Sequence, residues 1–130
     1  MKYILIIDDE ETVRDFLEHY FTKMNFIVIV HPNGASALEY LMSGKPADAV
    51  ITDLNMPIMS GMNFIKAVRS QKELLSLPIL VLSGNDRSES KIGALGVGAD
   101  DYITKPFNPE EILSRLNAIF RRIEIYKNKN

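Results

Sequence analysis

Tyr3-Ile4-Leu5-Ile6-Ile7 runs directly into Asp8-Asp9-Glu10, so a continuous apolar segment ends in three consecutive acidic residues. An apolar run without polar alternation is typical of a strand that is buried on both faces, as in a parallel sheet. Four comparable runs follow at residues 26–30, 49–51, 79–82 and, more weakly, 102–103. The sequence therefore predicts five buried strands.

The segments between these runs have helical spacing. Apolar residues recur at three- and four-residue steps within residues 13–24 and 112–123, which marks one helical face in each. Residues 35–42 and 62–68 are shorter versions, and Ser88–Val97 is a further predicted helix. This alternation predicts an α/β fold: a doubly wound, five-stranded parallel sheet with helices on both faces. With 130 residues, we expect one domain over residues 1–130.

Composition excludes several classes of function. Lys and Arg number 15 against 17 Asp and Glu, and a net charge of −2 offers no general basic field for nucleic acid or anionic lipid. The basic residues near the end of the chain, Arg121, Arg122, Lys127 and Lys129, are typical of a solvated helix end. The absence of Cys excludes disulfides and thiolate chemistry. No apolar run approaches the roughly 20 residues of a membrane helix, so we expect a cytoplasmic protein.

Polar residues stand where the apolar runs stop. Asp8 and Asp9 follow the first predicted strand, Asp53 the third, Ser83 the fourth and Lys105 the fifth. Ligands of an open parallel sheet bind outside the carboxyl ends of its strands, so these side chains are candidates for one site. Asp8 or Asp9 could instead cap a helix that starts near Glu10. Capping does not account for Lys105 or for the clustering at one edge.

These residue types suit phosphoryl transfer. Clustered carboxylates repel one another unless a cation lies between them, and Mg²⁺ prefers oxygen ligands. His19 and His31 are expected to be surface or packing residues, which argues against zinc. A carboxylate can itself attack phosphorus to give an aspartyl phosphate. Mg²⁺, Lys105 and Ser83 could then each take one oxygen of the transferred group.

The chain resembles the receiver domain of bacterial response regulators over nearly its whole length. Four pieces in order form the resemblance: Ile6-Ile7-Asp8-Asp9-Glu10, Asp53-Leu54-Asn55-Met56-Pro57 with Gly61, Leu82-Ser83-Gly84, and Gly98-Ala99-Asp100-Asp101-Tyr102-Ile103-Thr104-Lys105-Pro106-Phe107. It implies a flavodoxin-like fold with strand order 2-1-3-4-5. It also implies a phosphorylation-activated switch of a two-component system, which is not an enzyme beyond catalysing its own phosphorylation and dephosphorylation.

The resemblance implies a role for each site residue. Asp53 would be the phosphoacceptor, modified to 4-aspartylphosphate, and also a metal ligand. Asp9 would contact Mg²⁺ directly, Asp8 largely through water, and Asn55 through its backbone carbonyl, with Mn²⁺ a possible substitute. Lys105 would pair with Asp53 and then with the phosphoryl group, and its bond to Pro106 would be cis.

The resemblance further implies a switch and its partners. Ser83 would be the switch hydroxyl and Tyr102 the switch aromatic. Our hypothesis is that phosphorylation draws Ser83 toward the new oxygens and vacates space that Tyr102 then fills. This would alter the face formed by the fourth helix, fifth strand and fifth helix. A sensor histidine kinase or phosphotransfer protein would supply the phosphoryl group, and a downstream protein or a removed output domain would read the change.

Gly93 and Gly96 bear on this switch, because each lowers helix stability by roughly 0.8–1 kcal/mol relative to Ala in a helix interior. A weak fourth helix suits an element that must shift. The alternative is that Gly96 only ends this helix.

Two other interpretations of the function are open. A haloacid-dehalogenase-like phosphohydrolase also uses an aspartyl phosphate, but has a second Asp where this chain has Asn55. A receiver-like module that takes no phosphate would need none of the site residues that are present here.

The polar end, residues 124–130, is expected to be a frayed helix end and tail. It suits a single-domain regulator, and a linker to a removed effector domain would look the same.

Overall fold

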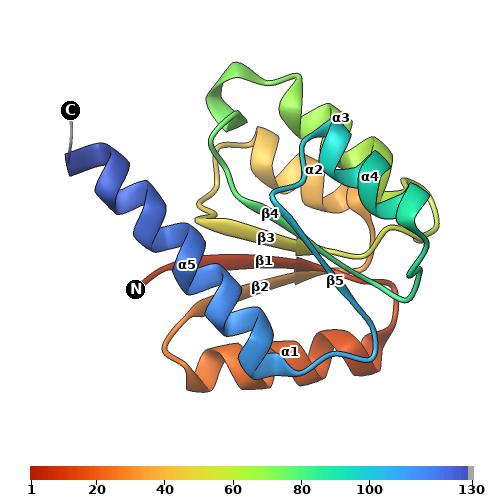
Figure 1. Cartoon of the computed structure of the whole chain (residues 1–130), viewed down its shortest axis with the longest axis horizontal. Coiled ribbons are helices and arrows are strands. Elements are labelled where there is room, and N and C mark those ends of the chain that lie inside the picture. Colours follow the sequence, from red (N-terminus) through yellow and green to blue (C-terminus); the bar gives the residue numbers. More distant parts are fainter. Residues whose placement is uncertain (129–130) are drawn as a thin grey trace.

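The computed structural model describes residues 1–128 and contains one five-stranded parallel sheet (Figure 1). Its strands are β1 (Tyr3–Ile7), β2 (Ile27–His31), β3 (Ala49–Thr52), β4 (Ile79–Ser83) and β5 (Asp101–Thr104). They pair in the order β2-β1-β3-β4-β5. The predicted strand order is confirmed, and each predicted strand lies within one residue of the observed one.

Helices cover both faces of the sheet, which confirms the doubly wound arrangement. They are α1 (Glu11–Lys23), α2 (Gly34–Met42), α3 (Gly61–Arg69), α4 (Ser88–Val97) and α5 (Pro109–Asn128), with a short 3-10 helix η1 (Lys72–Leu74). α2, α3 and α4 pack on one face, and α1 and α5 pack on the other. α5 stays helical from Glu124 to Asn128, where the sequence predicts a frayed end. Lys129 and Asn130, the rest of that predicted tail, lie outside the described residues.

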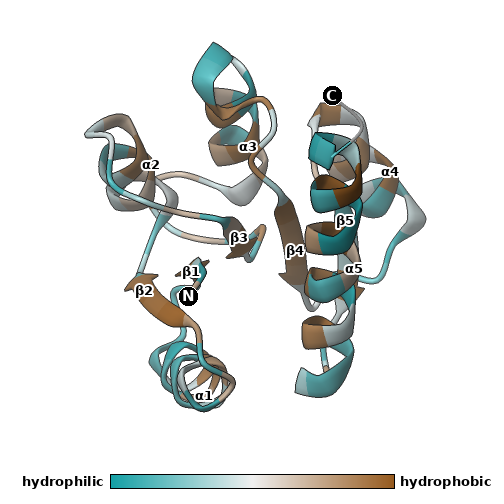
Figure 2. Ribbon diagram, turned by 90° about the vertical axis from the view of Figure 1, so that its left-hand side faces the viewer, coloured by the Kyte–Doolittle hydropathy of each residue, from teal (hydrophilic) through white to brown (hydrophobic). Residues whose placement is uncertain are grey.

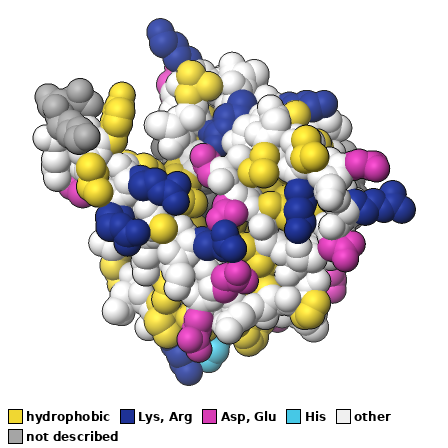
Figure 3. All heavy atoms as spheres, in the orientation of Figure 1, with side chains coloured by type: hydrophobic (Ala, Val, Ile, Leu, Met, Phe, Trp, Pro, Cys, Tyr) yellow, Lys and Arg dark blue, Asp and Glu magenta, His cyan; other side chains and the backbone are white. Residues whose placement is uncertain are grey.

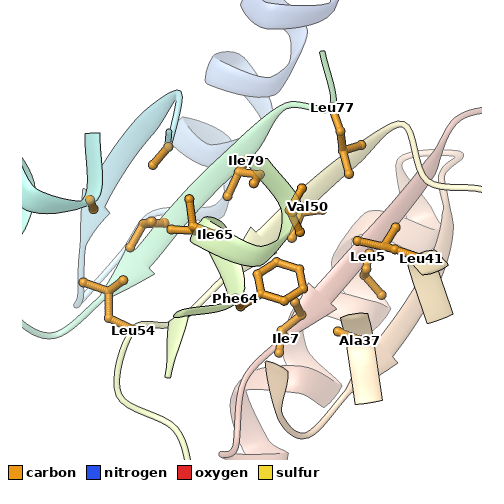
Figure 4. Packing of buried hydrophobic residues seen from close by; sticks show 14 of the residues in the cluster. Leu5, Ile7, Ala37, Leu41, Val50, Leu54, Phe64, Ile65, Leu77 and Ile79 are labelled. Atoms are coloured by element: carbon orange, nitrogen blue, oxygen red, sulfur yellow. The ribbon is translucent and has the colours of Figure 1, made fainter. Parts of the chain in front are cut away.

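Alternate residues of each strand fill the two cores. Leu5 and Ile7 belong to the core under α2, α3 and α4, whereas Ile4 and Ile6 belong to the core under α1 and α5. Phe64 of α3 points toward Ile7 (Figure 4) and is fully buried. Burying such a side chain stabilises the fold by roughly 1.5–3 kcal/mol. Burial on both faces explains why the strands are continuous apolar runs, as the brown ribbons of β2, β3 and β4 show in Figure 2.

The register of the strands positions the site. Ile7 of β1 is the partner of Thr52 of β3, so the residues that follow each strand emerge at the same edge. Ser83 of β4 pairs with Thr104 of β5, which places Lys105 at this edge as well. The loops that leave these strands gather at the right-hand side of Figure 1. No helix within residues 1–128 is both long enough and apolar enough to cross a membrane.

Two local features lower the intrinsic stability of α4. Its N-cap, Arg87, makes no side-chain cap hydrogen bond. Gly96 lies inside the helix, which ends at Val97 with Gly98 as C-cap at φ 125°. The alternative in which Gly96 ends the helix is therefore wrong, and Gly98 takes that role because a positive φ favours glycine.

Two glycine substitutions should change stability in opposite directions. A Cβ on Gly61 would collide with the Asp53 backbone oxygen, so we expect Gly61→Ala to destabilise the domain by roughly 1–3 kcal/mol through overpacking. A Cβ on Gly96 meets nothing within 4 Å, so Gly96→Ala should stabilise the domain by about 0.5–1 kcal/mol. Urea unfolding measures both, and equal effects would contradict this account of the close contact between Gly61 and Asp53.

Candidate functional site

Asp8 leaves β1 at the centre of the sheet and is 2% exposed. Its Oδ1 accepts a hydrogen bond from the Glu10 backbone N–H at 2.9 Å, and its Oδ2 lies 3.0 Å from Lys105 Nζ. The Arg14 guanidinium donates to the Asp8 backbone carbonyl at 2.8 Å. Both carboxylate oxygens are thus engaged within the site. Neither Asp8 nor Asp9 caps α1, because its N-cap is Glu10, which makes no side-chain cap hydrogen bond.

Asp53 follows β3 beside Asp8 and is 7% exposed. Its backbone N–H donates to the Ile7 carbonyl at 3.0 Å, which joins the ends of β3 and β1. Oδ1 accepts a hydrogen bond from the Leu54 N–H at 2.6 Å. Oδ2 faces Lys105 Nζ at the longer distance of 3.4 Å. One oxygen of Asp53 is therefore held firmly and the other more loosely.

Lys105 follows β5, the edge strand of the sheet, and its side chain reaches these carboxylates. Its backbone N–H donates to the Ser83 carbonyl at 2.8 Å, and its bond to Pro106 is cis, as predicted. Besides Asp8 and Asp53, Nζ approaches Glu10 Oε1 at 3.6 Å. A single ammonium thus contacts three carboxylates.

Burial and charge shift the pKa of both partners. Burial raises the pKa of Asp8, and this outweighs the hydrogen bonds from the Glu10 N–H and Lys105 that lower it. Burial alone would lower the pKa of Lys105, but the Asp8 hydrogen bond and the charges of Asp53 and Asp8 raise it above its ordinary value. Lys105 is therefore cationic at neutral pH and partly neutralises the cluster.

Ser83 and Tyr102 are linked through Asn85. Ser83 is fully buried, and its Oγ accepts a hydrogen bond from the Asn85 N–H at 3.2 Å. The Tyr102 hydroxyl donates to the Asn85 carbonyl at 2.6 Å, and Tyr102 is only 9% exposed. Tyr102 is thus already buried while Ser83 bonds to Asn85. This differs from the expected sequence of events, in which Tyr102 fills space only after Ser83 has moved.

The structure brings together some of the predicted site residues and not others. Asp8, Asp53 and Lys105 meet as expected. Glu10 joins them, whereas Asp9 is exposed and lies outside this cluster. Asn55 is exposed on the loop after β3. The run of three acidic residues at 8–10 indicated that Glu10 could belong to the site. The pattern does not say which of these side chains approach Lys105 and Asp53.

The carboxylates fit a divalent cation. Asp8, Glu10 and Asp53 each offer one carboxylate oxygen, and these oxygens lie within 4.8 Å of one another. The donors in this group are all oxygen, which suits a hard cation rather than zinc. Asp8 and Asp53 are buried, so water screens their repulsion poorly, and Lys105 supplies one positive charge against three negative ones.

Comparison with known proteins agrees with the fold. Residues 4–117 match the model of the response regulator receiver domain. The chain is 40% identical over 124 residues to the alkaline phosphatase synthesis transcriptional regulatory protein PhoP of Bacillus subtilis, which covers 95% of the chain and 50% of PhoP. It is 37% identical over 122 residues to the response regulator MprA of Mycobacterium ulcerans, covering 94% of the chain and 51% of MprA. The chain spans about half the length of these curated relatives.

Solved structures give the same result. The chemotaxis protein CheY4 of Vibrio cholerae superposes with a TM-score of 0.85 at 34% identity, covering 92% of this chain and 98% of CheY4. The receiver domain of the Francisella response regulator 1452 gives a TM-score of 0.86 at 30% identity, covering 95% and 99%. By sequence and by structure, the chain belongs to the receiver domain family of response regulators.

Proposed function

We propose that this receiver domain is switched by phosphorylation of Asp53, with the phosphoryl group coming from a phosphohistidine on a sensor kinase or phosphotransfer protein. The observation that supports this most is Lys105 Nζ, 3.0 Å from Asp8 Oδ2 and 3.4 Å from Asp53 Oδ2. An ammonium in this position can neutralise a phosphoryl oxygen as it arrives. Asp53 is the better acceptor because its Oδ2 is held more loosely than the oxygens of Asp8.

The transfer exchanges one bond for another. Oδ2 of Asp53 attacks phosphorus, and a P–O bond forms as the P–N bond of the phosphohistidine breaks. The imidazole, protonated on its other nitrogen, leaves as neutral imidazole. Hydrolysis later returns the free carboxylate and inorganic phosphate. The chain catalyses these two reactions on itself and no other.

The carboxylates would hold Mg²⁺, or Mn²⁺ in its place. Asp8 and Asp53 supply two ligands, Asp9 or Glu10 a third, and the Asn55 backbone carbonyl is a further candidate. When bound, the cation would neutralise one phosphoryl oxygen. Lys105 would then release Asp8 and take a second oxygen.

A turnover phosphatase is a weaker proposal. Such an enzyme needs an acid that protonates each departing alcohol. Two positions beyond Asp53 this chain has Asn55, whose amide cannot serve as that acid. One phosphoryl group per chain, followed by slow loss, fits the residues better.

The switch that we propose runs through the loop between β4 and α4. For the Ser83 hydroxyl to turn toward a phosphoryl oxygen, its bond from the Asn85 N–H must break. The Asn85 backbone carbonyl also accepts a hydrogen bond from the Tyr102 hydroxyl, so both contacts depend on one backbone segment. Movement of Asn85 would therefore reach Tyr102 and the start of α4 together.

The face that reads this movement consists of α4, β5 and α5. Arg115 of α5 pairs with Asp101 of β5 at 2.9 Å and with Glu111 at 3.2 Å, beside a groove of about 600 Å³. Acidic and basic side chains alternate in the middle of this face (Figure 3). A downstream protein, or an output domain in a longer form of the chain, would bind here. We place these events in the cytoplasm, where ATP is available to charge a sensor kinase.

Acetyl phosphate with Mg²⁺ should label the chain with one phosphoryl group on Asp53. We expect Asp53→Asn to abolish the mass gain, while Asp15→Asn, an exposed aspartate on α1, leaves it unchanged. Chelation of Mg²⁺ should slow labelling at least tenfold. Intact-mass spectrometry with peptide mapping measures this, and a phosphoryl group on another residue would rule out the assignment.

Removal of one acidic charge should stabilise the metal-free domain. Because the pKa of Asp8 is raised in the fold, its charged form costs stability above that pKa, and the cost disappears as pH falls below 3.8. We expect Asp8→Asn to raise the Tm by a few degrees at pH 7 in EDTA and to have little effect at pH 3.5.

Added Mg²⁺ should reverse this order, because a ligand that binds only the folded state raises its stability. The wild type should gain Tm with Mg²⁺ and Asp8→Asn should gain much less. A lower Tm for Asp8→Asn in EDTA at pH 7 would contradict our account of the charge balance.

Ser83→Ala should uncouple Asn85 from the phosphoryl group. With Mg²⁺ and beryllofluoride, the amide resonances of Asn85 and Tyr102 should shift in the wild type. The same two resonances should shift far less in Ser83→Ala. ¹H–¹⁵N NMR spectra test this. Full shifts at both amides in Ser83→Ala would remove the hydroxyl from the mechanism.

A further inference from the structure

The loop that follows Asp53 contains an isoleucine in an unusual backbone conformation. Ile58 has φ 71°, and around it the Met59 N–H donates to the Pro57 carbonyl at 2.8 Å. This bond and this φ define a γ-turn of the rare, strained form. A β-branched side chain is poorly suited to positive φ, where Gly or Asn are the usual residues.

The base of the loop fixes this conformation. The Gly61 N–H donates to the Leu54 carbonyl at 2.8 Å, which closes residues 54–61 into a compact loop. Gly61 packs so tightly on the Asp53 backbone that even a Cβ would collide with it. The base of the loop is therefore held against the Asp53 backbone.

Packing within the described chain does not offset this strain at Ile58. Its side chain is 82% exposed, so it gains little from burial. A single exposed isoleucine is ordinary, but an exposed one on a strained backbone is not. Backbone strain of this kind is concentrated at active sites, ligand-binding segments and switch regions.

We propose that Ile58 is a docking residue for the protein that donates the phosphoryl group, an inference that rests on the proposed function. Asp53 is 7% exposed at the base of the strand-end loops, so a histidine must enter past their rim. The surface that carries that histidine must then lie on the rim. Ile58 lies on the loop that follows β3 at this edge of the sheet, five positions beyond Asp53 in the sequence. A small phosphodonor would reach Asp53 without contacting Ile58.

Two kinds of donor separate docking from chemistry. One is acetyl phosphate with Mg²⁺, and the other is a ³²P-labelled histidine kinase core chosen because it phosphorylates the wild-type chain. Ile58→Ala removes most of the side chain, and Ile58→Gly removes it together with the strain. Ile125→Ala is the matched control, because Ile125 is 53% exposed on α5.

Both Ile58 variants should lower kcat/KM for transfer from the kinase about tenfold, the effect of losing roughly 1.4 kcal/mol of contact. Their rates with acetyl phosphate should stay within about twofold of wild type, and Ile125→Ala should be normal with both donors. Ile58→Gly should also raise the Tm by relieving the strain.

Normal transfer from the kinase to Ile58→Gly would overturn the proposal. So would equal slowing with both donors, which would mean a distorted Asp53 loop, or an effect confined to self-association in sedimentation, which would assign Ile58 to a second copy. If the wild type took no phosphoryl group from acetyl phosphate, the proposed function itself would fail, independently of how the Ile58 variants behave.

Discussion

The Lys105 ammonium holds together the acidic residues at the carboxyl edge of the sheet. It reaches from the end of β5 to Asp8 and Asp53, at the ends of the two central strands, and also approaches Glu10. Without this cation, buried carboxylates would face one another with little screening. The raised pKa of Asp8 shows that burial still disfavours its charge. The site is therefore short of positive charge, and this makes it receptive to a divalent cation.

The same geometry connects chemistry with movement. Lys105 also donates its backbone N–H to the Ser83 carbonyl, so the ammonium that we propose meets a phosphoryl group is anchored beside Ser83, the residue that we propose as the switch. Asn85 then joins Ser83 to Tyr102 by two backbone hydrogen bonds. α4 follows directly, without a side-chain N-cap and with glycine inside it. The charged edge of the sheet thus adjoins a helix that lacks a side-chain N-cap and contains glycine, an arrangement suited to converting a local charge change into a change of surface.

Much of this could be predicted from the sequence, because strand ends in a parallel sheet must meet at one edge. Asp8, Asp53 and Lys105 follow from that rule, and the strand order follows from the family resemblance. The choice of Glu10 over Asp9 does not, because three consecutive acidic residues do not reveal which side chain approaches Lys105. Nor does the buried position of Tyr102, which depends on a rotamer. The positive φ of Ile58 was also beyond prediction, since isoleucine normally signals extended backbone.

A crystal structure with Mg²⁺ and beryllofluoride would test the central role of Lys105 most directly. Our account predicts beryllium bonded to Asp53 Oδ2 and the cation bound by Asp8 and Asp53. It also predicts that Lys105 Nζ leaves Asp8 and contacts a fluorine. Beryllofluoride on a different carboxylate, or Lys105 still bridging Asp8 and Glu10 with the fluorines facing solvent, would contradict it.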